Sequence, residues 1–323
     1  MALCQLSNPF LPFSFPQQDK ERSENSLLMM KKTIYALGFF DGVHLGHQAL
    51  LSACGALSEE HGCRPGVCTF IGHPDTLVLG STPPLINTRA DRSRLLRHWG
   101  MEHLVELPFD RAMMELPWQD FFQMLRTRYN AGGIVCGDDF RFGYRGQGTA
   151  QLLSAACQAR NLPCAVIPQQ KLDGVTLSST YIRSQLECGD METAVRFLGH
   201  PHLLTGTVIS GRQLGRTLGI PTANLALPEG IITPRYGVYA CKVALDGREY
   251  LAVTNVGNRP TVNGHRVTVE PWILDFDGDL YGREITLRFY RFLRPEQKFP
   301  GLEELKAEIR KNAEQTRKYF EKR

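Results

Sequence analysis

Short apolar runs alternate with amphipathic segments through the first two thirds of the chain. Residues 33–37 are apolar and β-rich and are followed by Gly38, which predicts a buried strand. Residues 48–61 repeat apolar side chains at helical spacing and predict a helix. Further strands are predicted at 65–70, 104–107, 133–136 and 165–168, and further helices at 89–99, 118–128 and 149–160. This alternation is typical of a parallel sheet with helices on both faces.

The pattern changes after about residue 200, where short β-rich runs follow one another without helices. The runs cover 205–209, 237–245, 249–255, 265–274 and 284–292, with turns such as Asp246-Gly247, Asn263-Gly264 and Asp277-Gly278 between them. Such spacing predicts a small antiparallel β-barrel, and a helix is predicted over 302–319. The expected fold class is α/β, with a flexible extension over 1–30, a Rossmann-like parallel-sheet domain over 31–200 and a barrel domain with a terminal helix over 201–323.

Composition argues against several classes of function. Lys and Arg number 37 against 33 Asp and Glu, a net charge of +4. No dense basic run precedes the C-terminal helix, so no nucleic-acid partner is expected. No apolar stretch reaches roughly 18 residues, so no membrane span is predicted. The cysteines number nine and form no C-x-x-C pair, which argues against a zinc site and indicates a reducing cytoplasm.

The first candidate site follows the first predicted strand. Residues 38–47 read G-F-F-D-G-V-H-L-G-H and open the first predicted helix. Gly42 and Gly46 allow a ligand close to the backbone, and free N–H groups at a helix start favour an anion. His44 and His47 are three residues apart, so both can face one phosphate and stabilise charge that grows on an α-phosphate under attack. The alternative is a surface turn with two incidental histidines.

Three later segments contain related chemistry. Ser179, Thr180 and Arg183 combine hydroxyls with a guanidinium at helix-start spacing, which suits a polyphosphate, although a hydroxyl there is also a common helix cap. Residues 137–143 (G-D-D-F-R-F-G) follow a predicted strand and therefore reach the ligand crevice of such a sheet, although their phenylalanines also suit a core. Residues 70–74 (F-I-G-H-P) are a weaker segment of the same kind.

The barrel half contains a different phosphate-binding pattern. No G-x-x-x-x-G-K-[ST] sequence exists, which excludes a P-loop kinase. Glycines recur over residues 211–219, where loop amides can cradle phosphates, and Thr222 and Asn224 then supply neutral oxygens for Mg²⁺. The alternative is a glycine-rich hairpin in which Pro221 forms a rigid turn.

Glu270 interrupts an otherwise apolar predicted strand. A carboxylate there is costly without a partner, so a functional role is favoured. It could take the proton from a primary alcohol that attacks a γ-phosphate. The structural alternative is an ion pair, for instance with Arg259.

Both halves resemble one known family, the prokaryotic bifunctional riboflavin kinase/FAD synthetases. The segments from Gly38 to Arg183 resemble its adenylyltransferase half in order and approximate spacing. G-R-Q-L-G-R-T-L-G-I-P-T-A-N, N-V-G-N-R-P-T, V-E and D-L-Y-G resemble its kinase half. The resemblance covers nearly all residues after 31. Phe39 replaces a small polar residue, Tyr181 an arginine and Asn312 an aspartate of the commoner pattern, and the first two changes could weaken adenylyl transfer.

The resemblance implies that the chain phosphorylates riboflavin to FMN and adenylylates FMN to FAD, with ATP as co-substrate and Mg²⁺ as metal. Catalytic roles are implied for His44, His47 and Glu270, and metal binding for Thr222 and Asn224. Flavin contacts are implied for Asp139, Phe140 and Arg294, the last of these in a loop near the flavin. ATP contacts are implied for Gly38, Phe40, Asp41, Gly46, Ser179, Thr180, Arg183, Gly211, Gly215, Arg216 and Gly219.

Two alternatives stay open at this point. The chain could be a riboflavin kinase whose N-terminal half has weak or lost adenylyl transfer, or a non-enzymatic flavin or nucleotide sensor. The expected partners are the small molecules riboflavin, FMN and ATP, with no nucleic acid and no membrane. The expected working form is a cytoplasmic monomer or weak homo-oligomer.

Overall fold

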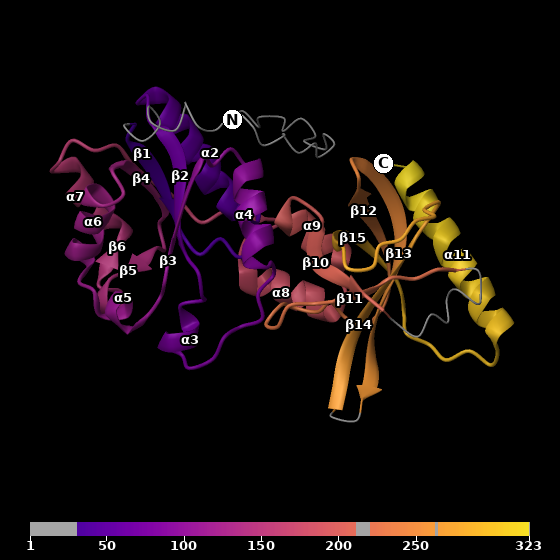
Figure 1. Ribbon diagram of the computed structural model, residues 1–323. Helices are drawn as coiled ribbons and strands as arrows, with labels where there is room; N and C mark the ends of the chain where they lie inside the picture. Colours follow the sequence, from indigo (N-terminus) through magenta and orange to yellow (C-terminus); the bar gives the residue numbers. More distant parts are fainter. Residues whose placement is uncertain (1–30, 211–219, 262–263, 323) are drawn as a thin grey trace.

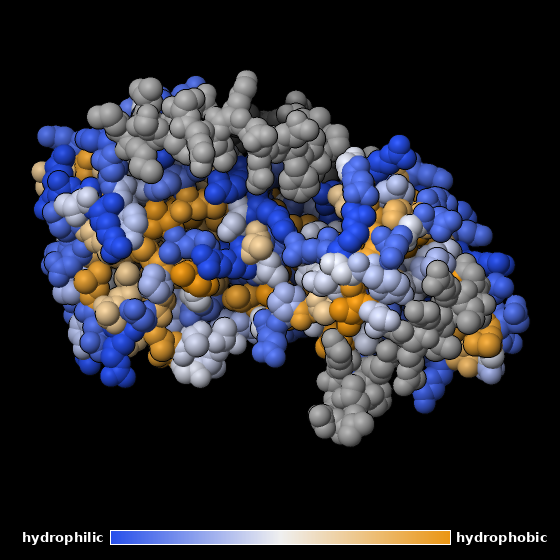
Figure 2. Space-filling model, in the orientation of Figure 1, coloured by the Kyte–Doolittle hydropathy of each residue, from blue (hydrophilic) through white to orange (hydrophobic). Residues whose placement is uncertain are grey.

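The computed structural model describes residues 31–210, 220–261 and 264–322. They form a parallel sheet flanked by helices and, beside it, a closed β-barrel with a long terminal helix (Figure 1). The fold class expected from the sequence is confirmed. Within these ranges, no helix is both long and apolar enough to cross a membrane. On the face shown in Figure 2, hydrophobic patches are broken up by hydrophilic residues.

The parallel sheet has the strand order β3-β2-β1-β4-β7. Every residue of the central strand β1 is buried. Because side chains alternate along a strand, Tyr35 and Leu37 join the apolar cluster on one face, and Ile34 and Ala36 join the cluster on the other. Burial on both faces explains the continuous apolar run of this strand. The strands are β1 (Thr33–Leu37), β2 (Arg64–Phe70), β3 (His103–Leu107), β4 (Ala131–Gly137) and β7 (Cys164–Ile167).

The helices predicted around the sheet are present, and their ends differ by a few residues. The first begins at residue 45 rather than 48, because His44 caps it. These helices are α2 (Leu45–Glu60), α4 (Arg89–His98), α6 (Trp118–Thr127) and α7 (Ala150–Gln158). Short elements that the sequence pattern does not predict are α3 (Asp75–Val78), α5 (Arg111–Glu115), β5 (Arg141–Phe142), η1 (Tyr144–Gly146), β6 (Gly148–Thr149), β8 (Lys171–Leu172) and β9 (Val175–Thr176).

The barrel closes in the order β10-β11-β14-β13-β12-β15. The turn predicted at Asp246-Gly247 is confirmed: φ is 50° and 77° at these residues, and Leu245 pairs with Arg248. Asn263, in a second predicted turn, lies outside the described residues. The terminal helix α11 (Leu302–Glu321) lies against the barrel (Figure 1). The strands are β10 (His202–Ile209), β11 (Asn224–Ala226), β12 (Gly237–Leu245), β13 (Arg248–Thr261), β14 (Gly264–Ile273) and β15 (Glu284–Pro295).

The apolar core of the barrel continues into α8 (Ser179–Cys188) and α9 (Met191–Leu198), which Figure 1 shows between the sheet and the barrel. Leu186 of α8 and Phe197 of α9 belong to the same buried cluster as Val269 of β14. The domain boundary that the sequence predicts between residues 200 and 201 therefore lies just after two helices of the sheet half, and the apolar faces of these helices pack on the barrel.

Candidate active sites

The loop from Gly38 to His44 joins β1 to α2 at the carboxyl edge of the sheet. β1 pairs with β2 on one side and with β4 on the other, so the loop lies where the strand order reverses, the usual ligand crevice of such sheets. Phe40 and Val43 are fully buried and have φ of 60° and 40°, a conformation that is costly for residues other than glycine. The packing around the loop thus holds a strained backbone in one shape.

His44 and His47 lie together at the start of α2, as the sequence predicts. His44 is the N-cap of the helix, and its Nδ1 accepts a hydrogen bond from the backbone N–H of His47 at 3.3 Å. The two rings stack with centroids 3.7 Å apart and an interplanar angle of 17°. A Cβ added at Gly46 would lie 3.2 Å from the His44 ring, so the glycine leaves room for this stack.

Burial controls the charge of the two imidazoles. It lowers the pKa of His44 to about 4, with a smaller contribution from His200. It lowers the pKa of His47 well below its usual value, helped by His44 and Arg92. Both rings are therefore neutral near pH 7. Because Nδ1 of His44 accepts a hydrogen bond, the proton of the neutral ring is assigned to Nε2, which is then a donor for a phosphate oxygen.

Ser179 and Arg183, far away in the sequence, contact the same loop. The hydroxyl of Ser179 donates to the carbonyl of Asp41 at 2.8 Å, and Nη2 of Arg183 lies 2.7 Å from the Asp41 carboxylate. The cap of α8 is Ser178, not Ser179 or Thr180, so the alternative of a simple cap does not apply to these two. The sequence prediction that this segment and the first loop form one site is consistent with these contacts. Thr180 is exposed on the first turn of α8.

Asp41 and Phe40, for which the resemblance implies ATP contacts, have buried side chains. The Asp41 carboxylate is 3% exposed, and besides Arg183 it accepts hydrogen bonds from the backbone N–H groups of Ile86 and Asn87 at 2.9 and 3.4 Å. Burial raises the pKa of Asp41, while Arg183 opposes that rise. Phe40 is fully buried in the core. Both side chains shape the loop, and the ATP contacts expected of these residues stay predictions.

Arg92 of α4 is a site residue that the sequence analysis does not identify. It is 3% exposed, and its guanidinium donates to the carbonyls of Phe39 at 3.1 Å and Phe70 at 2.7 Å. The same guanidinium lies 4.4 Å from the centroid of the Phe39 ring. It therefore ties the loops after β1 and β2 together. The local sequence R-A-D-R-S-R resembles a solvated helix face, and nothing in it marks the second arginine as buried.

The loop after β4 contributes Asp139 and Phe140. Asp139 is exposed, and its carboxylate accepts a hydrogen bond of 2.9 Å from Gln169, which follows β7. Phe140 is partly buried and stacks on Phe142 with centroids 5.4 Å apart. Asp139 thus lies at the carboxyl edge of the sheet as predicted, whereas Phe140 also has the core contacts of its structural alternative.

In the barrel half, three polar residues occupy neighbouring strands. Leu225 of β11 pairs with Val269 of β14, and this antiparallel register sets Asn224 opposite Glu270. On the other side of β14, Glu270 pairs with Asn255 of β13. Glu270 is partly buried. The three residues therefore form a row across the barrel wall, on the face opposite to the buried Val269.

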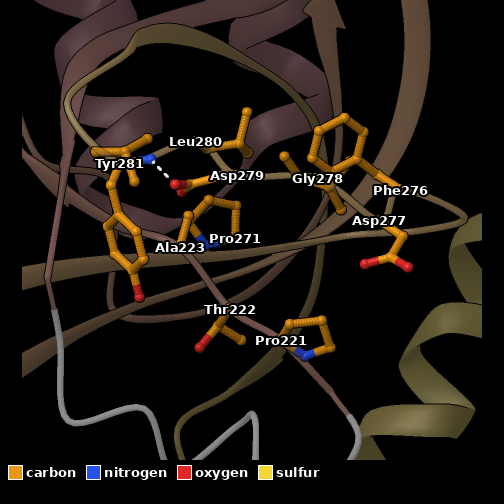
Figure 3. A pocket seen from close by; sticks show the side chains of 12 residues that line it. Pro221, Thr222, Ala223, Pro271, Phe276, Asp277, Gly278, Asp279, Leu280 and Tyr281 are labelled. Carbon is orange, nitrogen blue, oxygen red and sulfur yellow. Dashed lines mark hydrogen bonds between the residues drawn. The ribbon is translucent and has the colours of Figure 1, made fainter.

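A cavity of about 590 Å³ in the same half is lined by Pro271 and Ile273 of β14, which flank and alternate with Glu270 and Trp272 along the strand. Thr222, which forms an isolated bridge with Trp272, also lines the cavity. Figure 3 shows the rings of Phe276 and Tyr281 on either side of Pro271 and Ala223, with Thr222 below them. The other glycine-loop residues expected to bind ATP, Gly211, Gly215, Arg216 and Gly219, lie outside the described residues, as does the side chain of Arg259.

Arg294 is part of a strand rather than a loop, which corrects the sequence expectation. It belongs to β15 and pairs with Val238 of β12. Its Nε donates to Oδ1 of Asn312 at 3.1 Å and lies 3.5 Å from Glu308, both on α11. The sequence pattern predicts that this strand ends at residue 292, but pairing with β12 continues it to Pro295. Asn312 is buried and anchors this arginine.

Comparison with known proteins gives matches in both halves. A family model described as FAD synthetase matches residues 28–181, and one described as riboflavin kinase matches residues 198–320. The bifunctional riboflavin kinase/FMN adenylyltransferase of Escherichia coli strain K12 is 36% identical over 293 residues, which cover 89% of this chain and 92% of that protein. The protein of the same name from Bacillus subtilis strain 168 is 34% identical over 294 residues, 90% of this chain and 93% of that protein.

The fold is shared with a solved structure. A Streptococcus pneumoniae protein described as a macrolide-efflux protein is 31% identical, with a TM-score of 0.81, over 89% of this chain and 94% of that chain. The likeness thus extends over both the sheet and the barrel. From the two family matches and the length over which the relatives align, the chain belongs to the bifunctional riboflavin kinase/FMN adenylyltransferase family.

Proposed function

We propose that this chain phosphorylates riboflavin to FMN in its barrel half and adenylylates FMN to FAD in its sheet half, with ATP as co-substrate of both steps. The observation that carries this function is the presence of both family matches on one chain. We assign the first domain to residues 31–200 and the second to 201–323. The residue roles that follow rest on the geometry of the two sites.

In the sheet half, a phosphate oxygen of FMN attacks the α-phosphorus of ATP. A new P–O bond forms, the bond to the β-phosphate oxygen breaks, and pyrophosphate leaves. The attacking group is already an anion, so no protein nucleophile is needed. The neutral rings of His44 and His47 donate hydrogen bonds to the oxygens on which charge grows, and the buried loop holds these donors in place beforehand.

Ser179, Thr180 and Arg183 complete this site from α8. The hydrogen bond from Ser179 to the Asp41 carbonyl keeps the helix start against the loop. Thr180 then offers an exposed hydroxyl, and Arg183 a cation, beside the same phosphates. The main chain of Gly38 and Gly46 approaches the nucleotide, and Asp139 lies at the neighbouring strand end, on the flavin side.

In the barrel half, the 5′-hydroxyl of riboflavin attacks the γ-phosphorus of ATP, and ADP leaves. Glu270 accepts the proton of that hydroxyl as general base. Its position opposite Asn224 and Asn255 places neutral amides on both sides of the carboxylate. The cavity beside Thr222 is the nucleotide site, because its volume lies in the range of roughly 300–1,000 Å³ typical of small-molecule pockets and two aromatic rings line it.

Mg²⁺ fits the barrel site as a metal that arrives with the nucleotide. Within the described residues, no group of three His, Cys, Asp or Glu side chains is placed to hold a metal. Thr222 and Asn224 instead supply neutral oxygens, which suit Mg²⁺ when phosphates and water provide the other ligands. When bound, the metal neutralises charge on the transferred phosphoryl group. We further infer a cytoplasmic monomer or weak homo-oligomer that needs no nucleic acid.

Product analysis tests the function directly. The purified chain is incubated with riboflavin, ATP and Mg²⁺, and FMN and FAD are quantified separately. Both products are expected, with FMN preceding FAD. FMN alone would favour a kinase with a silent sheet half, and neither product with retained flavin binding would favour a sensor.

A further inference from the structure

Residues 84–87, here named the strap, belong to the sheet half and contact the barrel half. The strap lies between α3 and α4 in the sequence. Its Leu85 forms a parallel β-bridge with Ile231, which follows β11 in the barrel half. The backbone N–H of Leu85 donates to the carbonyl of Gly230 at 2.8 Å, and the N–H of Ile232 donates to the carbonyl of Leu85 at 2.8 Å. The strap is thus fixed to the barrel half by its main chain.

The same four residues hold the loop of the sheet half. The N–H groups of Ile86 and Asn87 donate to the Asp41 carboxylate, and the carbonyl of Pro84 accepts a 2.8 Å hydrogen bond from Nε of Arg183. Arg183 also contacts Asp41, so the strap, the carboxylate and the guanidinium form a closed set. Every side chain in this set belongs to the sheet half.

Apolar packing fixes the strap in the same position. The side chain of Ile86 is fully buried in one cluster with Ile182 of α8 and Ile232 of the barrel half. A Cβ added at Gly42 would lie 3.0 Å from Cδ1 of Ile86, so the strap touches the backbone of the loop directly. A shift of the strap would therefore move Asp41, Gly42 and Arg183 together.

We infer that the barrel half positions the adenylyl-transfer loop through the strap, and that the backbone N–H of Ile232 is a positioning group for the first site although it belongs to the second half. This inference rests on the proposed function. The N–H of Ile232 contacts no substrate. It holds Leu85 in place, and the strap residues around Leu85 in turn hold Asp41 and Arg183. Ile232 also follows β11, the strand that begins with Asn224. The strap therefore links segments next to both proposed nucleotide sites.

Two neighbouring proline substitutions test the inference. Ile232→Pro removes the N–H that donates to Leu85. Ile231→Pro controls for a proline at the neighbouring position, because in a parallel bridge the central residue turns its own N–H away from the partner strand, and neither strap hydrogen bond uses it. Ile232→Val keeps the N–H and should behave as the wild type. Adenylylation of supplied FMN and phosphorylation of riboflavin are measured separately on each preparation.

We expect Ile232→Pro to lower kcat/KM for ATP in FMN adenylylation about tenfold, on the scale of a small misplacement of catalytic groups, while riboflavin phosphorylation stays within about twofold. Ile231→Pro and Ile232→Val should keep both activities. Wild-type adenylylation by Ile232→Pro, or an equal loss in Ile231→Pro, would overturn the positioning role. A wild-type chain that makes no FAD from FMN would instead refute the proposed function.

Amide hydrogen exchange on the unmodified chain tests the same link if Ile232→Pro does not fold. The amides of Leu85, Ile86 and Ile232 bridge the strap to its two neighbours, so one cooperative unit should protect them to within about threefold. Rapid exchange at Ile232 with Ile86 still protected would show that the barrel contact opens alone, which contradicts the inference.

Discussion

The ring of His44 lies flat against the ring of His47, with their centroids 3.7 Å apart. Two charged imidazoles at that separation would repel each other, and burial keeps both neutral. The pair therefore offers hydrogen-bond donors rather than fixed positive charge. Under the proposed function, a polyphosphate that enters the site would receive donors already oriented by the helix start.

Removing both rings should separate the two activities. We expect His44→Ala with His47→Ala to lower FMN adenylylation by roughly 10³-fold or more, because single donors to a developing charge contribute about 10²–10³-fold. Riboflavin phosphorylation should continue, so FMN accumulates while FAD does not form. Chromatography of the products checks this result. His61→Ala, at an exposed position of the same half, is the control. FAD synthesis near the wild-type rate would refute the assignment of the pair.

Replacing the carboxylate of Glu270 should stop the other step. We expect Glu270→Gln to lower riboflavin phosphorylation by roughly 10²–10⁴-fold, the usual contribution of a positioned general base, while riboflavin still binds. Supplied FMN should still be converted to FAD. The matched control is Glu249→Gln on neighbouring β13, where the carboxylate contacts Lys242 and Arg288. Turnover close to normal in Glu270→Gln would favour the sensor alternative.

Acid should destabilise the folded chain in a defined range. The pKa of His44 is lowered from 6.5 to about 4, and that of His202 to about 3. Between these values and 6.5 the unfolded chain binds protons that the folded chain does not, so stability falls as pH is lowered from about 6.5 towards 4. At about 1.4 kcal/mol per pKa unit, the shift of His44 alone corresponds to at most roughly 3–4 kcal/mol. Urea unfolding at pH 7, 6 and 5 measures this loss; constant stability over the range would contradict it.

His202 offers a way to make the chain more stable. It is fully buried beside Phe289, and neither of its ring nitrogens has a hydrogen-bond partner among the described residues. An unsatisfied buried polar group costs about 1–3 kcal/mol, so His202→Leu should raise the free energy of unfolding at pH 7 by about 1–2 kcal/mol. Denaturant unfolding measures the change, with His61→Leu as an exposed control that should give no gain. A loss of stability would show that the imidazole has a structural role.

Local sequence patterns predicted the elements and their order well. β1 has the predicted bounds, and the histidine pair lies at the predicted helix start. These features depend on residues close together in the chain, where apolar spacing and capping act directly. The burial of the Asp41 and Phe40 side chains was not indicated by the local sequence, because distant partners bury both; their ATP contacts stay predictions.

Long-range partners account for most of what the sequence did not indicate. Arg92 reads as a solvated charge in its own helix, and only the fold brings it under the carbonyls of Phe39 and Phe70. Arg294 was expected in a loop, yet strand pairing with β12 carries it into β15. In both cases a backbone group far along the chain decides the position, and such pairings leave no period in the local sequence.

The apolar cluster that α8 and α9 share with the barrel couples the unfolding of the two halves. Leu186 and Phe197 would be exposed to water if the two halves were pulled apart, and their burial favours the joined state. Heating should therefore melt both halves in one transition rather than two. If the sheet half is produced alone, the apolar faces of α8 and α9 are exposed to water. Such a fragment should aggregate unless these faces are redesigned with polar residues.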